Sequence, residues 1–224
     1  MTKLSTKNIP TSGGATPKTL QPGNNVAKIN SITLEPFTFL PGAFHLILNL
    51  EGIDRGKDFE GFFINKDKPE LGRHKGQVGK VKASEWAYAD GTTKSGIVVS
   101  RDVEIMKYLN NICKELGITW MTDQDDKHDT IESLVNQFNV DKPFKNVMLN
   151  FCIAGKEYLN KEGYTNHDLF LPKYAKGQVP FEICDKPNSK IMKFNEADHI
   201  KKKKVENVTS FGSDAVATSS DFEL

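Results

Sequence analysis

The sequence of 224 residues has no long apolar stretch and little cysteine. No run approaches the ~18 consecutive apolar residues of a membrane-spanning helix, so we expect neither such a helix nor a membrane partner. The three cysteines, Cys113, Cys152 and Cys184, are odd in number and far apart, which excludes a disulfide framework and a zinc knuckle. Residues 1–24 contain no hydrophobic segment of a secretory signal. These absences favour a reducing, cytoplasmic compartment.

Signatures of catalysis are also missing. Residues 72–81 fail as a phosphate-binding loop, because His74 stands where a glycine is needed and Val81 stands where a magnesium-binding hydroxyl is needed. Residues 123–129 hold four acids and a histidine but lack the glycine and the distal glutamate of a calcium loop. We interpret them as a solvated loop between two helices. No enzyme, metal site or cofactor is therefore expected.

The two ends of the chain carry opposite charge, although the net charge is only +1. Residues 1–24 contain three lysines and no acid, whereas residues 205–224 contain four acids and no base. Both ends are poor in large apolar residues, which is typical of disordered segments. We therefore expect a flexible basic arm at 1–22, a folded domain at 23–188, and a basic run followed by a disordered acidic tail at 189–224.

The folded part is predicted to be mainly β. Residues 160–163 predict a hairpin turn with Gly163 in the left-handed conformation, and residues 66–82 are interpreted as a basic, glycine-punctuated loop. Strands are predicted where apolar residues alternate with polar ones or form short runs, at 26–34, 44–50, 59–64, 97–99, 147–153, 156–159, 164–171 and 181–183.

A pair of helices is predicted as an insertion at about residues 100–139. Ser100 is expected to cap the first helix and Gly117 to end it, with Cys113 on its apolar stripe. Asp129 or Thr130 is expected to cap the second helix. Strands on both sides of a helical insertion predict a mainly β (α+β) fold, an OB-like small β-barrel.

The basic segment 66–82 is preceded by Phe62 and Phe63 and followed by Trp86 and Tyr88, and lysines and tyrosines are interleaved in the hairpin after Gly155. Single-stranded nucleic acid needs both, because cations neutralise its phosphates and flat rings stack on its unpaired bases. The alternative is that about half of these rings belong to the core and the lysines only aid solubility. The candidate DNA-binding residues are Arg73, Lys75, Lys80, Lys82, Trp86, Lys156, Tyr158, Lys161 and Tyr164.

The last four residues, Asp221, Phe222, Glu223 and Leu224, place acids around an aromatic and an aliphatic side chain. Such a segment can dock in a hydrophobic pocket with a basic rim on a partner protein. It can also compete with nucleic acid for a basic groove of its own chain. A plain disordered end is the alternative.

Three segments, residues 44–52, 75–86 and 155–164, resemble single-stranded-DNA-binding proteins of tailed bacteriophages, especially crAss-like gut phages. The resemblance covers roughly residues 20–182 and extends to the layout of barrel, interposed helix, return hairpin and acidic tail. It implies non-catalytic protection of single-stranded DNA during replication or recombination in the bacterial host cytoplasm. The tail is similar to those of bacterial single-strand binders, whose ends dock replication or recombination proteins, but it has fewer acids and ends in leucine.

Two other functions fit the same residues. The barrel could be a structural or assembly protein of a phage virion, in which the lysines are incidental. It could also bind RNA, because the contact that distinguishes RNA from DNA is made to the 2′-hydroxyl and leaves no mark in this sequence. The sequence leaves the oligomeric state open.

Overall fold

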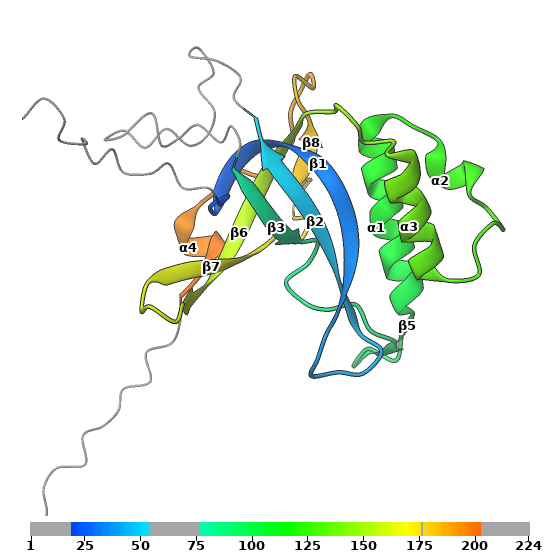
Figure 1. Cartoon of the computed structure of the whole chain (residues 1–224), viewed down its shortest axis with the longest axis horizontal. Coiled ribbons are helices and arrows are strands. Elements are labelled where there is room, and N and C mark those ends of the chain that lie inside the picture. The colour runs from blue at the N-terminus through cyan, green and yellow to red at the C-terminus, as the bar shows by residue number, and fades with distance from the viewer. Residues whose placement is uncertain (1–18, 54–76, 176, 203–224) are drawn as a thin grey trace, which may run out of the picture.

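The computed structural model describes residues 19–53, 77–175 and 177–202. Five strands form a closed barrel (Figure 1): β1 (Gly23–Pro36), β2 (Phe44–Gly52), β3 (Val78–Lys82), β6 (Leu149–Leu159) and β7 (Thr165–Phe170). Their order around the barrel is β1-β2-β3-β7-β6, and β6 pairs with β1 to close it. Only β3 and β7 run parallel among these neighbours. This arrangement confirms the predicted OB-like fold class.

The smaller strands extend or flank the barrel. β8 (Phe181–Ile183) pairs with residues 149–151 at the start of β6. β9 (Ile200–Lys201) follows the short helix α4 (Glu196–His199) and runs parallel to β6. β4 (Gly91–Thr92) and β5 (Val98–Val99) form a separate two-stranded ribbon. The strand predicted at 97–99 therefore exists, but it lies outside the barrel.

The helical insertion follows the sequence prediction closely. α1 (Arg101–Leu116) begins after Ser100 and ends at Gly117, whose φ of 68° is left-handed. α3 (Ile131–Asp141) is capped by Thr130, whose side chain accepts a hydrogen bond from the Ser133 backbone nitrogen, and α2 (Trp120–Asp123) is a single turn between them. In the part of the chain that the structure describes, no helix has the length and apolar character needed to cross a membrane.

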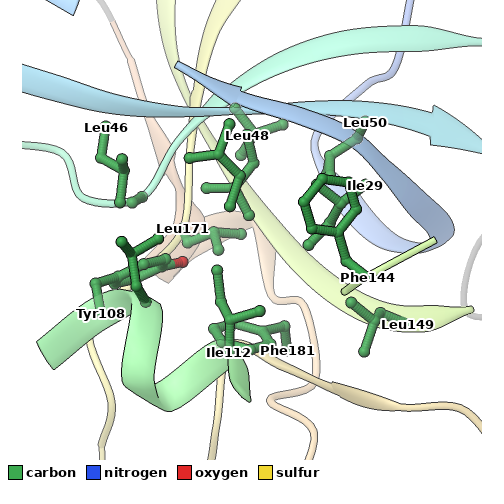
Figure 2. Packing of buried hydrophobic residues seen from close by; sticks show 14 of the residues in the cluster. Ile29, Leu46, Leu48, Leu50, Tyr108, Ile112, Phe144, Leu149, Leu171 and Phe181 are labelled. Atoms are coloured by element: carbon green, nitrogen blue, oxygen red, sulfur yellow. The ribbon is translucent and has the colours of Figure 1, made fainter. Parts of the chain in front are cut away.

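The core lies between the barrel and the helices. Leu46, Leu48 and Leu50 alternate along β2 and point inward, as a strand requires. They meet the buried side chains of Tyr108 and Ile112 from α1 (Figure 2). Cys113 is buried in the same cluster, as predicted from its place on the apolar stripe.

β3 corrects the predicted loop at 66–82, because residues 78–82 form a barrel strand. Val81 is the one residue of this strand that is fully buried, and Gly79 is a weak strand former. The strand forms because β2 supplies five paired positions, from Ile47 to Glu51. The strand predicted at 59–64 lies outside the described residues.

A second correction concerns β6, which was predicted as two strands and is continuous through Gly155. A Cβ atom at Gly155 would lie 2.7 Å from Cγ of Pro22, and one at Gly79 would lie 2.9 Å from Cβ of Leu20. The segment before β1 thus crosses from β3 to β6, with Leu20 buried in the core. These two glycines are the points at which the crossing segment contacts the strands. The hairpin between β6 and β7 has Gly163 at φ 83°, as predicted.

Candidate nucleic-acid interface

A groove of about 610 Å³ lies between β3 and the β6–β7 hairpin. It exists because β3 and β7 pair only at Lys82 and Phe170, while the start of β3 pairs with Thr19 instead. The hairpin lies on the side of the barrel away from α1 and α3 (Figure 1). We call this hollow the β3–hairpin groove; its lining residues with polar or aromatic side chains are Thr19, Asn30, Asn49, Lys80, Tyr158, His167 and Asp168.

Exposed aromatic rings stand in the groove and in two loops of the barrel. Tyr158 in the groove is 47% exposed, and Tyr164 at the hairpin turn is 69% exposed. Phe39, in the loop between β1 and β2, is 87% exposed, and its ring contacts Phe37 edge to face at a centroid distance of 5.6 Å. OB-type barrels bind oligonucleotides on the second and third strands and through these same two loops. Phe39 and Tyr164 thus stand in the two loops that such barrels use, and Tyr158 stands in the groove.

The lysines of β3 already have carboxylate partners. Lys80 is 2.6 Å from Glu35 of β1, and Lys82 is 2.5 Å from Asp168 of β7. Lys156, beside Tyr158 and Asp168 in an adjoining hollow, makes no ion pair within the described part of the chain. Among the described residues, this side of the barrel thus combines two paired lysines with one that makes no ion pair.

His45 of β2 lies next to these ion pairs. Its ring meets that of Phe37 edge to face at a centroid distance of 5.2 Å, and its Nδ1 atom is buried with no hydrogen-bond partner among the residues that the structure describes. Burial lowers the pKa of this imidazole and the charge of Lys82 lowers it further, against the weaker opposite effects of Asp168 and Glu35. We therefore treat His45 as neutral at pH 7.

The structure brings some of the predicted site residues together and separates others. Lys80 and Tyr158 line the groove, Lys82 is paired to its wall at Asp168, and Lys156 adjoins it. Trp86, 65% exposed, stands in the bend after β3 and is not part of the groove lining. Lys161 and Tyr164 lie at the exposed hairpin turn. The predicted residues that lie outside the described part of the chain are Arg73, Lys75, Asp221, Phe222, Glu223 and Leu224.

Several residues of this face were missed by sequence reasoning. Asn49 and Lys80 are register partners on β2 and β3, and alternation with the buried leucines of β2 would have placed Asn49 on the outer face. Phe39 lies between Pro36 and the Pro41-Gly42 pair, and an aromatic ring in such a turn-forming segment is the signal that could have identified it. Glu35 and Asp168 gave no local signal, because their lysine partners are far away in the sequence.

The described chain ends beside the hairpin. β9 places Lys201 opposite Lys156 of β6, and the Lys201 ammonium lies 5.8 Å from the centre of the Phe170 ring while it pairs with Glu85. The last described residues therefore lie next to Lys156 of the hairpin.

No model of a protein family, no curated protein and no solved structure matches this chain. The fold class therefore rests on the strand pairings, and any function must be argued from the site. Cations, open aromatic rings and side-chain amides on one face of a barrel suit an extended, unpaired and negatively charged polymer.

Proposed function

We propose that this chain is a non-catalytic single-stranded-DNA-binding protein that protects unpaired DNA during phage replication or recombination in the host cytoplasm. The observation that carries the proposal is the β3–hairpin groove, which places the ammonium of Lys80 and the half-exposed ring of Tyr158 in one hollow. Phosphates and bases of one strand can contact both at once. A duplex would offer only its phosphates, because its bases are already stacked and paired.

The exposed rings support the same proposal through their energetics. Each base that stacks on an aromatic side chain contributes about 1–3 kcal/mol, with little dependence on sequence. Three exposed rings are available: Tyr158 in the groove, Phe39 in the β1–β2 loop and Tyr164 at the β6–β7 turn. Binding that combines a few stacked bases with a few phosphate contacts is strong at low salt and weakens as salt rises.

The acidic tail has a proposed role at the same site. Residues 205–224 carry four acids and no base, and the chain enters this segment beside Lys156 and Lys201. A tethered polyanion is present at high effective concentration near its own cationic face. We propose that the tail competes with DNA and, once displaced, presents Phe222 and Leu224 to a replication or recombination protein.

The test is a titration of oligo-dT followed by tryptophan fluorescence at several salt concentrations. Trp120 is buried whereas Trp86 is exposed, so a change on binding reports mainly on Trp86, and a Trp86→Phe variant identifies that signal. Parallel titrations with oligo-U of equal length and with a duplex separate DNA, RNA and double-strand binding. Oligo-dT that shows no binding even at low salt would reject the proposal and favour the virion-protein alternative.

A further inference from the structure

We infer that Glu35 and Asp168 are built-in competitors of the DNA phosphates, so that the affinity and salt dependence of this face are set by carboxylates as well as by lysines. The inference rests on the proposed function, since it names the groups that regulate the same site. It concerns two residues that no local sequence pattern marks as part of a DNA-binding face.

The geometry places each carboxylate on the cation that a phosphate would need. Glu35 at the end of β1 bonds to Lys80, and Asp168 on β7 bonds to Lys82, so both partners come from strands other than β3. Asp168 and Lys80 line the same groove. A phosphate that enters the groove would therefore meet ammonium groups already occupied by carboxylates of the protein.

Both pairs are open enough to exchange partners. The side chains of Lys80 and Glu35 are each more than 40% exposed, and the Asp168 side chain is 48% exposed although Lys82 is less so. Ion pairs in contact with water are weak, so a phosphate can replace the carboxylate at a cost of about two- to fivefold in affinity for each pair. The carboxylates thus weaken the phosphate contacts without preventing them.

Exchange also changes the salt dependence. Each phosphate that is neutralised releases about 0.7 of a counterion from a single strand. A carboxylate that loses its lysine in the same step gains a cation from solution, which offsets part of that release. The wild-type slope of log affinity against log salt should therefore be shallower than the number of lysines at the face implies.

The experiment compares wild type with Glu35→Gln and Asp168→Asn by fluorescence anisotropy of a labelled dT oligonucleotide. Each substitution removes one carboxylate and keeps its shape. We expect each to raise affinity about two- to fivefold near 0.05 M salt, less so near 0.2 M, with a steeper slope. Glu104→Gln is the matched control, because Glu104 pairs with Lys107 on the exposed side of α1, away from this face.

The Lys80→Ala background makes the test specific. If Glu35 acts by occupying Lys80, Glu35→Gln will give no gain in that background, and Asp168→Asn will give none in Lys82→Ala. The inference would be overturned if the gains in affinity were no larger than that of Glu104→Gln, or if they persisted without the lysine. Binding of oligo-dT by the wild type would still uphold the proposed function in that case. Failure of wild type and all variants to bind near 0.05 M salt would overturn both. Melting temperatures check that each variant is folded. If Asp168→Asn is unstable, the comparison of Glu35→Gln with and without Lys80 decides the question.

Discussion

The side chain of Asn139 on α3 is bonded to both backbone polar groups of Ile32 on β1. Its Nδ2 atom donates to the Ile32 carbonyl oxygen at 2.6 Å, and its Oδ1 atom accepts from the Ile32 nitrogen at 2.8 Å. The pairing of β1 with β6 ends at Ala27, so Asn139 makes the two hydrogen bonds that a neighbouring strand would otherwise make. This contact both covers a strand edge and holds the helical insertion on the barrel.

Removal of that amide should destabilise the protein. Asn139→Ala leaves a backbone N–H and a C=O of β1 unpaired in a partly buried position, so we expect a loss of about 1–3 kcal/mol in the free energy of unfolding. Urea denaturation measures it. Gln137→Ala, which removes an exposed bond to Asp141 on the same helix, should stay within about 0.5 kcal/mol of wild type; equal effects of the two variants would contradict this role.

Tyr158 should contribute to DNA affinity and little to stability. Its ring is half exposed in the groove, so Tyr158→Ala should lower oligo-dT affinity by about 1–3 kcal/mol if a base stacks there. Tyr174→Ala is the control, since Tyr174 is similarly exposed at 48% but lines a different hollow beside α1. An equal loss of affinity in both variants would place the strand elsewhere.

The lysines of β3 should govern part of the salt dependence. Replacing Lys80 and Lys82 by alanine should flatten the slope of log affinity against log salt by up to about 1.4, because each phosphate contact contributes about 0.7. Adding Arg73→Ala and Lys75→Ala should bring the change to about two or more. Lys107→Ala on α1 serves as control, and a slope unchanged by the four substitutions would move the phosphate contacts to another surface.

His45 should make stability depend on pH. Its folded pKa is lowered from the ordinary value of 6.5, mainly by burial, so the unfolded chain binds the proton more tightly. The stability contributed by neutral His45 is fully present above pH 6.5 and is lost as the pH falls through the folded pKa. A His45→Gln variant should lack this part of the loss. NMR titration of the His45 ring checks the direction, and a pKa at or above 6.5 would contradict it.

The tail should weaken DNA binding at low salt. Deletion of residues 207–224 removes three of the four acids of the tail, Asp214, Asp221 and Glu223, and leaves Glu206. The truncated protein should therefore bind oligo-dT more tightly, and the gain should shrink as salt screens the interaction. It should also lose its partner in a pull-down from infected cells. Unchanged affinity at every salt concentration would exclude competition by the tail.

Local sequence patterns predicted those elements whose boundaries depend on local chemistry. Gly117 and Thr130 mark helix ends through capping, Ser100 stands at the N-cap position of α1 without a side-chain capping bond, and Gly163 marks the hairpin through its left-handed backbone. β3 was missed because its single buried residue, Val81, gives almost no periodic signal. Its pairing with β2 and β7 is what makes it a strand.

The candidate site was only partly predictable for a similar reason. The sequence indicated Lys80, Lys82 and Tyr158 through composition, since lysines and aromatic residues are interleaved there. It could not indicate Glu35 and Asp168, which lie 45 and 86 residues from their lysine partners. Such pairings follow from the closure of the barrel, so the balance of charge at this face is a property of the fold.

The proposed function requires one DNA strand to lie in the groove between β3 and the β6–β7 hairpin. The most direct test is photocrosslinking of oligo-dT to the wild-type protein at low salt, followed by mass spectrometry of the modified peptides. We expect crosslinks in the hairpin peptide that contains Tyr158 and His167, and their loss under competition by unlabelled oligo-dT. Crosslinks confined to α1 and α3, with none in β3 or the hairpin, would contradict the claim.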